Sequence, residues 1–193
     1  MNGVNWNLWT TKPAPNNSWT WTLATRLSHM LAEAETRFGN RNPAWTFVGV
    51  EFVDDVPSVW FPGYSAGVRQ HVAIRLSGFT INNYLMSYWQ LAHECVHLLT
   101  PTGKSEANNL EEGLTTIFQG EYMKTNFNFS CQTGNQKYDR CASLLSPWLQ
   151  QDPDFIKKLR QQQNTICHIT KGNILAVNPL IPSNIAEELA MKF

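Results

Sequence analysis

Strand-forming and helix-forming segments are grouped apart along this chain, and that grouping limits its fold more than any other sequence feature. Aromatic and β-branched residues predict strands at Trp45–Val53, Val59–Phe61 and His71–Leu76. Before them, apolar residues spaced by threes and fours predict a helix over Trp19–Phe38, and helical spacing returns after Asn83. Strands grouped between helices favour an α+β fold over a wound parallel sheet.

Helical signals dominate the second half of the chain. The predicted helices lie at roughly Asn83–Leu99, Ser105–Lys124, Asn135–Gln150, Pro153–Gln163 and, as a short tail, after Pro182-Ser183. The length of 193 residues suits one ordinary domain, or one domain of two lobes. We therefore predict a single domain over 1–193, with the sheet in an upper lobe (1–100) and helices in a lower lobe (101–193).

The predicted helix Asn83–Leu99 contains the sequence His93-Glu94-Cys95-Val96-His97. Two imidazoles four residues apart project from the same side of a helix and can reach one zinc ion, while Glu94 between them is placed to act on a metal-bound water. Helical geometry turns Cys95 roughly 200° from His93, which predicts that this thiol fills the core. The alternative is a buried helix whose two histidines are satisfied by core hydrogen bonds.

A second chemical feature follows on the next predicted helix, as Leu110-Glu111-Glu112-Gly113-Leu114-Thr115. A His-Glu-x-x-His sequence followed by a helical Glu-Gly-Leu-Thr segment resembles the gluzincin branch of the zincin metallopeptidases, and the chain is similar in size to the minimal single-domain gluzincins. The resemblance implies a zincin-like fold and zinc held by His93, His97 and Glu112, with fourteen residues between His97 and Glu112. Helical geometry agrees, since Glu112 heads the polar side of its helix and Glu111 is turned about 100° away. For Glu111 a solvated carboxylate, or one that contacts a ligand residue and not the metal itself, is favoured over direct ligation.

The same resemblance implies a catalytic domain that hydrolyses peptide bonds in a peptide or protein substrate. Zinc would lower the pKa of its bound water, and Glu94 would take the proton of this water as general base. A tyrosine or histidine of the lower lobe would then stabilise the oxyanion. The candidates are Tyr138 and His168, followed by Tyr64 and Tyr122; Tyr138 is favoured because it lies on the helix after the glutamate helix, although a packed aromatic is the alternative reading of this residue.

The resemblance also carries an expectation about substrate binding and two departures from the family. In that family the strand before the active-site helix borders the cleft, so His71–Leu76 would pair with substrate backbone; an interior strand is the alternative. Thr116 stands where thermolysin-like enzymes place an aspartate that holds a ligand histidine. The aminopeptidase sequence that recognises a substrate amino terminus has no counterpart, which leaves the substrate class open.

Charge and hydropathy exclude two classes of partner. Lys plus Arg and Asp plus Glu are both 15, and no basic run occurs, so we expect no nucleic acid or anionic membrane partner. No apolar stretch approaches the roughly 18 residues of a membrane span and no signal peptide is evident, so the expected compartment is the cytoplasm, with export by another route left open. Cys95, Cys131, Cys141 and Cys167 are then four free thiols, or Cys131 and Cys141 form a bridge if the chain is exported.

Two other functions stay open beside the peptidase. The first is a zinc-stabilised regulatory or protein-binding module with a vestigial peptidase site, motivated by the small size and by tryptophans in the N-terminal half that a partner would contact (Trp6, Trp9, Trp19, Trp21, Trp45 and Trp60). The second is a structural protein with a chance motif. The segment 1–17, which contains Pro13 and Pro15, is a candidate arm over the cleft, and the oligomeric state stays open.

Overall fold

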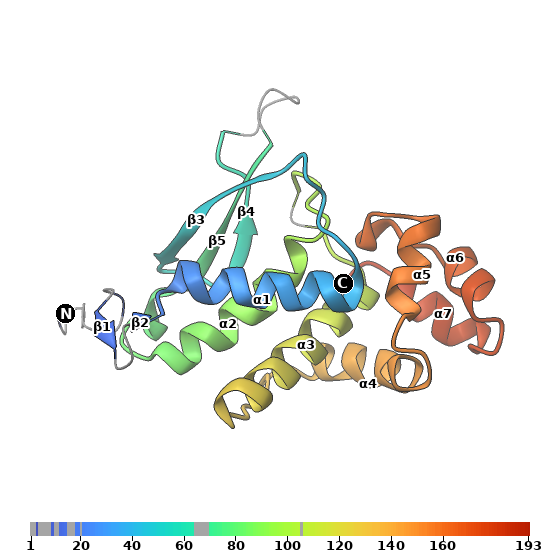
Figure 1. The fold of residues 1–193 in the computed structure, drawn as a ribbon. Coiled ribbons are helices and arrows are strands. Elements are labelled where there is room, and N and C mark those ends of the chain that lie inside the picture. The colour runs from blue at the N-terminus through green and yellow to red at the C-terminus, as the bar shows by residue number, and fades with distance from the viewer. Residues whose placement is uncertain are drawn as a thin grey trace.

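A three-stranded mixed sheet lies against long helices in the computed structural model, and further helices complete the C-terminal half (Figure 1). The structure describes residues 3, 9, 12–14, 18–19, 21–63, 70–104 and 106–193. Its strands are β1 (Pro13–Ala14), β2 (Ser18–Trp19), β3 (Thr46–Val53), β4 (Ser58–Trp60) and β5 (His71–Ser77). Its α-helices are α1 (Leu23–Phe38), α2 (Tyr84–His97), α3 (Asn109–Phe127), α4 (Gln136–Gln151), α5 (Phe155–Gln162), α6 (Lys171–Val177) and α7 (Ser183–Ala190). This is an α+β architecture, as predicted.

The strand before α2 lies in the middle of the sheet. The order is β3-β5-β4, and β5 pairs parallel with β3 and antiparallel with β4. The expectation that His71–Leu76 binds substrate along a free edge is therefore wrong, and the alternative of an interior strand is correct. Alternation along a strand reports which faces are buried; it carries no information about which edges are already paired.

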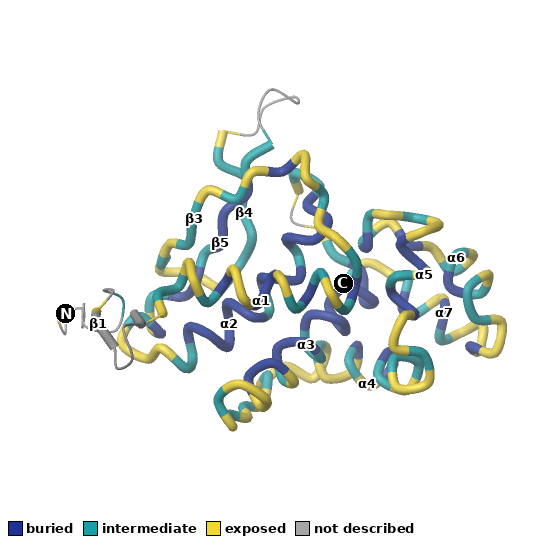
Figure 2. Tube along the Cα trace, viewed as in Figure 1, coloured by how far each residue is buried: buried dark blue, intermediate teal, exposed yellow. Residues whose placement is uncertain are grey.

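The sheet, α1, α2 and α3 share one apolar core, in which α1 and α2 pack against each other and against the sheet. Val72, Ile74 and Leu76 of β5 are buried and belong to one apolar cluster with residues of α1, α2, α3 and the C-terminal helices (Figure 2). Cys95 is fully buried in this cluster, as predicted. The first long helix starts at Leu23, later than the predicted Trp19, because the Thr22 side chain caps its first turn.

Helices α3 and α4 approach each other closely at Gly113. A Cβ atom built on Gly113 would lie 2.6 Å from the backbone oxygen of Cys141, a distance that no side chain tolerates without movement of one helix. Gly113 directly follows Glu112, so the contact also fixes how the first turn of α3 sits against α4. A glycine at this position is therefore a packing requirement of the Glu-Gly sequence.

Two glycine-to-alanine variants of α3 should change stability in opposite directions. We expect Gly113→Ala to lower the free energy of unfolding by about 1–3 kcal/mol, because the new methyl group overlaps the α4 backbone. Gly120→Ala adds its methyl group where no atom lies within 4 Å, so it should raise stability by about 0.5–1 kcal/mol through helix propensity. Urea denaturation measures both values, and equal effects would contradict the close approach at Gly113.

A buried arginine joins the C-terminal helices to the N-terminal half. Arg160 of α5 donates hydrogen bonds to the carbonyl oxygens of Phe38, Gly39 and Asn40, at 2.9, 2.6 and 2.6 Å, where α1 ends. These carbonyls have no partner within the helix, so the guanidinium satisfies them.

Helix α6 was not predicted from the sequence. It begins at a Thr170 capping box. Within the described part of the chain, no helix combines the length and apolar character that a bilayer crossing requires.

Candidate metal centre

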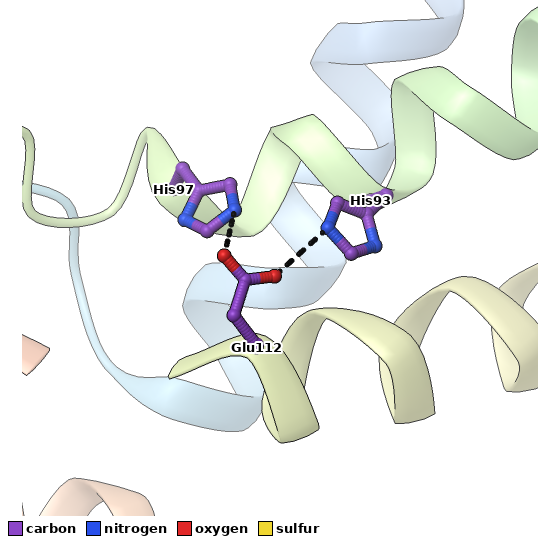
Figure 3. A group of neighbouring side chains, drawn as sticks. All are labelled: His93, His97 and Glu112. Atoms are coloured by element: carbon purple, nitrogen blue, oxygen red, sulfur yellow. Dashed lines mark hydrogen bonds and ion pairs between the residues drawn. The ribbon is translucent and has the colours of Figure 1, made fainter. Parts of the chain in front are cut away.

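Two neighbouring helices bring His93, His97 and Glu112 together. The histidines lie one turn apart on α2, and Glu112 lies in the first turn of α3, which begins after the Asn108 cap. Glu112 Oε2 is 3.2 Å from His93 Nε2, and Glu112 Oε1 is 3.7 Å from His97 Nε2. Figure 3 shows the carboxylate pointing from α3 between the two imidazoles of α2. One ligand atom from each residue lies within 4.8 Å of the others.

The three side chains are electrostatically coupled. Burial acts to lower the pKa of His97, but the carboxylates of Glu112 and Glu111 outweigh it and raise this pKa to about 10. Burial acts to raise the pKa of Glu112, but the imidazoles of His97 and His93 outweigh it, so the pKa lies below its ordinary value. Without metal at neutral pH, the site therefore pairs an imidazolium with a carboxylate.

Two further polar side chains of α3 contact the imidazoles: Glu111 contacts the ring nitrogen of His97 that points away from Glu112, and Thr115 contacts the same ring nitrogen of His93 as Glu112 does. Glu111 Oε1 lies 3.0 Å from His97 Nδ1, which leaves Nε2 of this ring to face Glu112. Thr115 Oγ1 lies 3.2 Å from His93 Nε2 and also donates to the Glu112 carbonyl. Thr116, at the position that corresponds to the aspartate of thermolysin-like enzymes, donates to the Glu112 carbonyl and holds neither ring by a hydrogen bond. The sequence predicted a solvated or supporting carboxylate for Glu111 but did not identify His97 as its partner, and it gave no sign of the contact between Thr115 and His93.

Glu94 borders the same cavity as the three residues of the triad. Its side chain is 5% exposed, and the backbone N–H of Val59 in β4 donates a hydrogen bond to it. Burial raises the pKa of Glu94 above its ordinary value, although His93 and His97 oppose this shift. A carboxylate with a raised pKa is a stronger base than an ordinary glutamate when it is ionised.

Tyr138 is the predicted oxyanion donor that the structure brings to the site. Its ring lies 5.3 Å from the His93 ring, centroid to centroid, and it lines the cavity. Burial raises its pKa to about 12, so the phenol keeps its proton at neutral pH and can donate it in a hydrogen bond. Tyr122 is buried elsewhere against His29, His168 is exposed outside the cavity, and Tyr64 lies outside the described residues.

The cavity between α2, α3 and β4 has a volume of about 190 Å³. The edge strand β4 borders the cavity through Ser58 and Val59. The sequence had predicted that the strand His71–Leu76, which is β5, would border it. Phe193 also lines the cavity, and no sequence signal placed it there. The triad, Glu94 and Tyr138 therefore border one cavity.

The donor set fits a divalent metal ion. Two imidazole nitrogens and one carboxylate oxygen form the three-ligand set of catalytic zinc sites, which keep a further position open. The close approach of these ligand atoms, and the contact of Glu111 with the Nδ1 atom of His97, match the ligand orientation that such sites require. Imidazole and carboxylate ligands also bind other first-row metals, so the donor atoms by themselves do not select zinc.

Comparisons with models of known protein families, with curated proteins and with solved structures found no match for this chain. The functional conclusion therefore depends on the geometry of the site.

Metal uptake should release about one proton per ion at pH 7.5. His97 has a pKa of about 10 in the metal-free protein and must lose its proton to bind a metal. Calorimetric titrations in buffers of different ionisation enthalpy measure this number. Glu111→Gln removes one of the carboxylates that raise the pKa, so this variant should release fewer protons. A heat of binding that is independent of the buffer would show that His97 is already neutral or does not bind the ion.

Proposed function

We propose that this protein is a zinc-dependent peptidase of the zincin type, with His93, His97 and Glu112 as metal ligands. The observation that carries the proposal is the presence of Glu94 in the cavity that the three ligands face. A structural metal site needs no buried carboxylate beside its ligands, whereas hydrolysis needs a base at this place.

The chain's own residues supply the remaining functions of a hydrolytic site. When bound, the ion would act as a Lewis acid that polarises a carbonyl group and makes water more acidic. Glu94, held by the Val59 N–H, would accept the proton of the attacking water and pass it to the leaving amine. Tyr138 would donate a hydrogen bond to the oxyanion that forms on the substrate. Glu111 would keep the His97 imidazole in position through its Nδ1 atom.

We expect the substrate backbone to lie on the β4 side of the cavity. An extended peptide can align along an edge strand, and β4 is the edge strand that borders the site. The proposed substrate is a peptide or a protein segment in extended conformation.

A purified-protein assay tests the proposal. Metal analysis after zinc loading should find about one equivalent per chain, and the loaded protein should cleave members of a mixed peptide library. Chelation should stop cleavage, and added zinc should restore it. One equivalent of zinc without cleavage of any library member would refute the peptidase function.

A metal-stabilised binding module is the second candidate. It is favoured by the contact of each histidine with a glutamate of α3, because a metal here would fasten α2 to α3 whether or not hydrolysis occurs. The tryptophans give it less support: Trp45 is buried and Trp9 packs on Phe52, while Trp21 is exposed. Trp6, the Trp19 side chain and most of the segment 1–17 lie outside the described residues. Chelation that melts the fold of a protein without hydrolytic activity would select this function.

A further inference from the structure

The last three residues of the chain return from α7 to the cavity. The backbone N–H of Asn109 donates to the Met191 carbonyl at 2.9 Å, and the N–H of Phe193 donates to the Ala107 carbonyl at 3.0 Å. These two bonds flank an antiparallel bridge between Asn108 and Lys192. In Figure 1 this end of the chain lies in the middle of the molecule, near the junction of α2 and α3. The segment 191–193 is therefore bound by an isolated antiparallel bridge beside the start of α3.

Side chains of this segment fill positions next to the proposed reaction site. The Phe193 ring lies 4.7 Å from the Tyr138 ring, centroid to centroid, and it lines the cavity of the triad. The Lys137 ammonium lies 4.0 Å from the centre of the Phe193 ring. Lys192 Nζ pairs with Glu106 Oε2 at 3.2 Å. One aromatic and one basic side chain thus occupy two adjacent subsites.

The segment is held by few contacts compared with the helix before it. Ala186 and Leu189 of α7 are fully buried, so α7 is fixed in the core. Beyond α7, the side chain of Met191 is exposed and the pair of Lys192 with Glu106 is on the surface. Phe193 supplies the main apolar contact, and its displacement would require no change in α7.

We propose that 106–109, Lys137 and Tyr138 form a groove that binds extended peptides with a basic residue followed by an aromatic residue, and that Met191–Phe193 occupies this groove in cis. The groove then presents the substrate of the proposed peptidase to the triad, and the segment competes with that substrate. This regulatory part rests on the proposed function, whereas the binding of peptides does not.

Peptide binding tests the groove without any need for hydrolysis. The probe is a fluorescein-labelled Ala-Met-Lys-Phe amide, and anisotropy measures its affinity for the zinc-loaded full chain with Glu94→Gln in every sample. Phe193→Ala removes the anchor of the competing segment, so we expect at least about tenfold tighter binding of the probe than without this change. Lys192→Glu should act in the same direction, because it places a second carboxylate beside Glu106.

Matched controls separate this effect from a general change in the protein. Phe79→Ala truncates an aromatic side chain that is 76% exposed, and it should leave the affinity within twofold of its starting value. A probe that ends in Ala instead of Phe should bind at least tenfold more weakly to Phe193→Ala. If neither Phe193→Ala nor Lys192→Glu improves binding by more than twofold, the proposal is overturned.

Hydrolysis by chains that keep Glu94 tests the competition. For a peptide with a Lys-Phe pair, Phe193→Ala should raise kcat/KM at least fivefold and leave kcat within twofold. A lower kcat would overturn the proposal, because it would show that Phe193 serves to position Tyr138. If no chain hydrolyses any peptide but Phe193→Ala binds the probe more tightly, the groove stands and the proposed peptidase fails.

Discussion

Replacement of Glu94 by glutamine is expected to reduce peptide hydrolysis by about 10²- to 10⁴-fold, the contribution of a positioned general base. Glutamine keeps the shape of the side chain but cannot accept the proton of the attacking water. Glu94 is not one of the three converging ligands, so zinc content should stay at one equivalent. Steady-state kinetics on the best library peptide and metal analysis of the same sample give both values.

A surface glutamate supplies the control for this variant. Glu187 pairs with Lys171 on the surface, outside the cavity of the triad, so Glu187→Gln makes the same chemical change without touching the site. It should hydrolyse peptides at the wild-type rate. Activity of Glu94→Gln within tenfold of the wild type would remove Glu94 from the mechanism.

Loss of the Glu112 carboxylate should weaken zinc binding more than any other change in α3. Glu112→Gln removes a direct ligand, whereas Glu111→Gln removes a partner that only orients His97. Loss of an orienting partner reduces metal affinity by roughly 10- to 100-fold, and loss of the ligand should exceed this range. Competition with a chromophoric zinc chelator measures both constants on folded protein.

The order of these two effects distinguishes the roles of adjacent glutamates. The residues are neighbours in sequence and both are buried, so a general loss of packing would affect them alike. A greater loss of affinity in Glu111→Gln than in Glu112→Gln would reverse the assignment of ligand and partner. Equal, small losses would show that His93 and His97 bind the ion without either carboxylate.

The three proposed ligands could be predicted from the sequence because their spacing follows the geometry of an α-helix. His93 and His97 lie on one side of α2 simply because they are four residues apart, and Glu112 lies at the start of the next helix. It was harder to predict which side chains of α3 face α2. Thr115 reaches His93 although Thr116 was the expected position, because one residue changes the direction of a side chain by about 100°.

Features that depend on distant segments were not predictable in this way. The position of β5 in the middle of the sheet depends on which strands pair, and its own alternation is the same at an edge or in the centre. Phe193 reaches the cavity by contacts between distant segments, as in the pair of Lys192 with Glu106, whose positions differ by 86. No periodic pattern connects two such segments, so only the folded structure brings them together.

All three proposed ligands come from a short stretch of chain, since Glu112 lies only 19 positions after His93. An ion held there closes a small loop, and the entropy lost on closing a loop grows with its length. Two adjacent helices can therefore assemble around the ion before the sheet or the C-terminal helices have docked. Binding of the proposed ion would thus be a local event, which needs only α2 and α3 to be in contact.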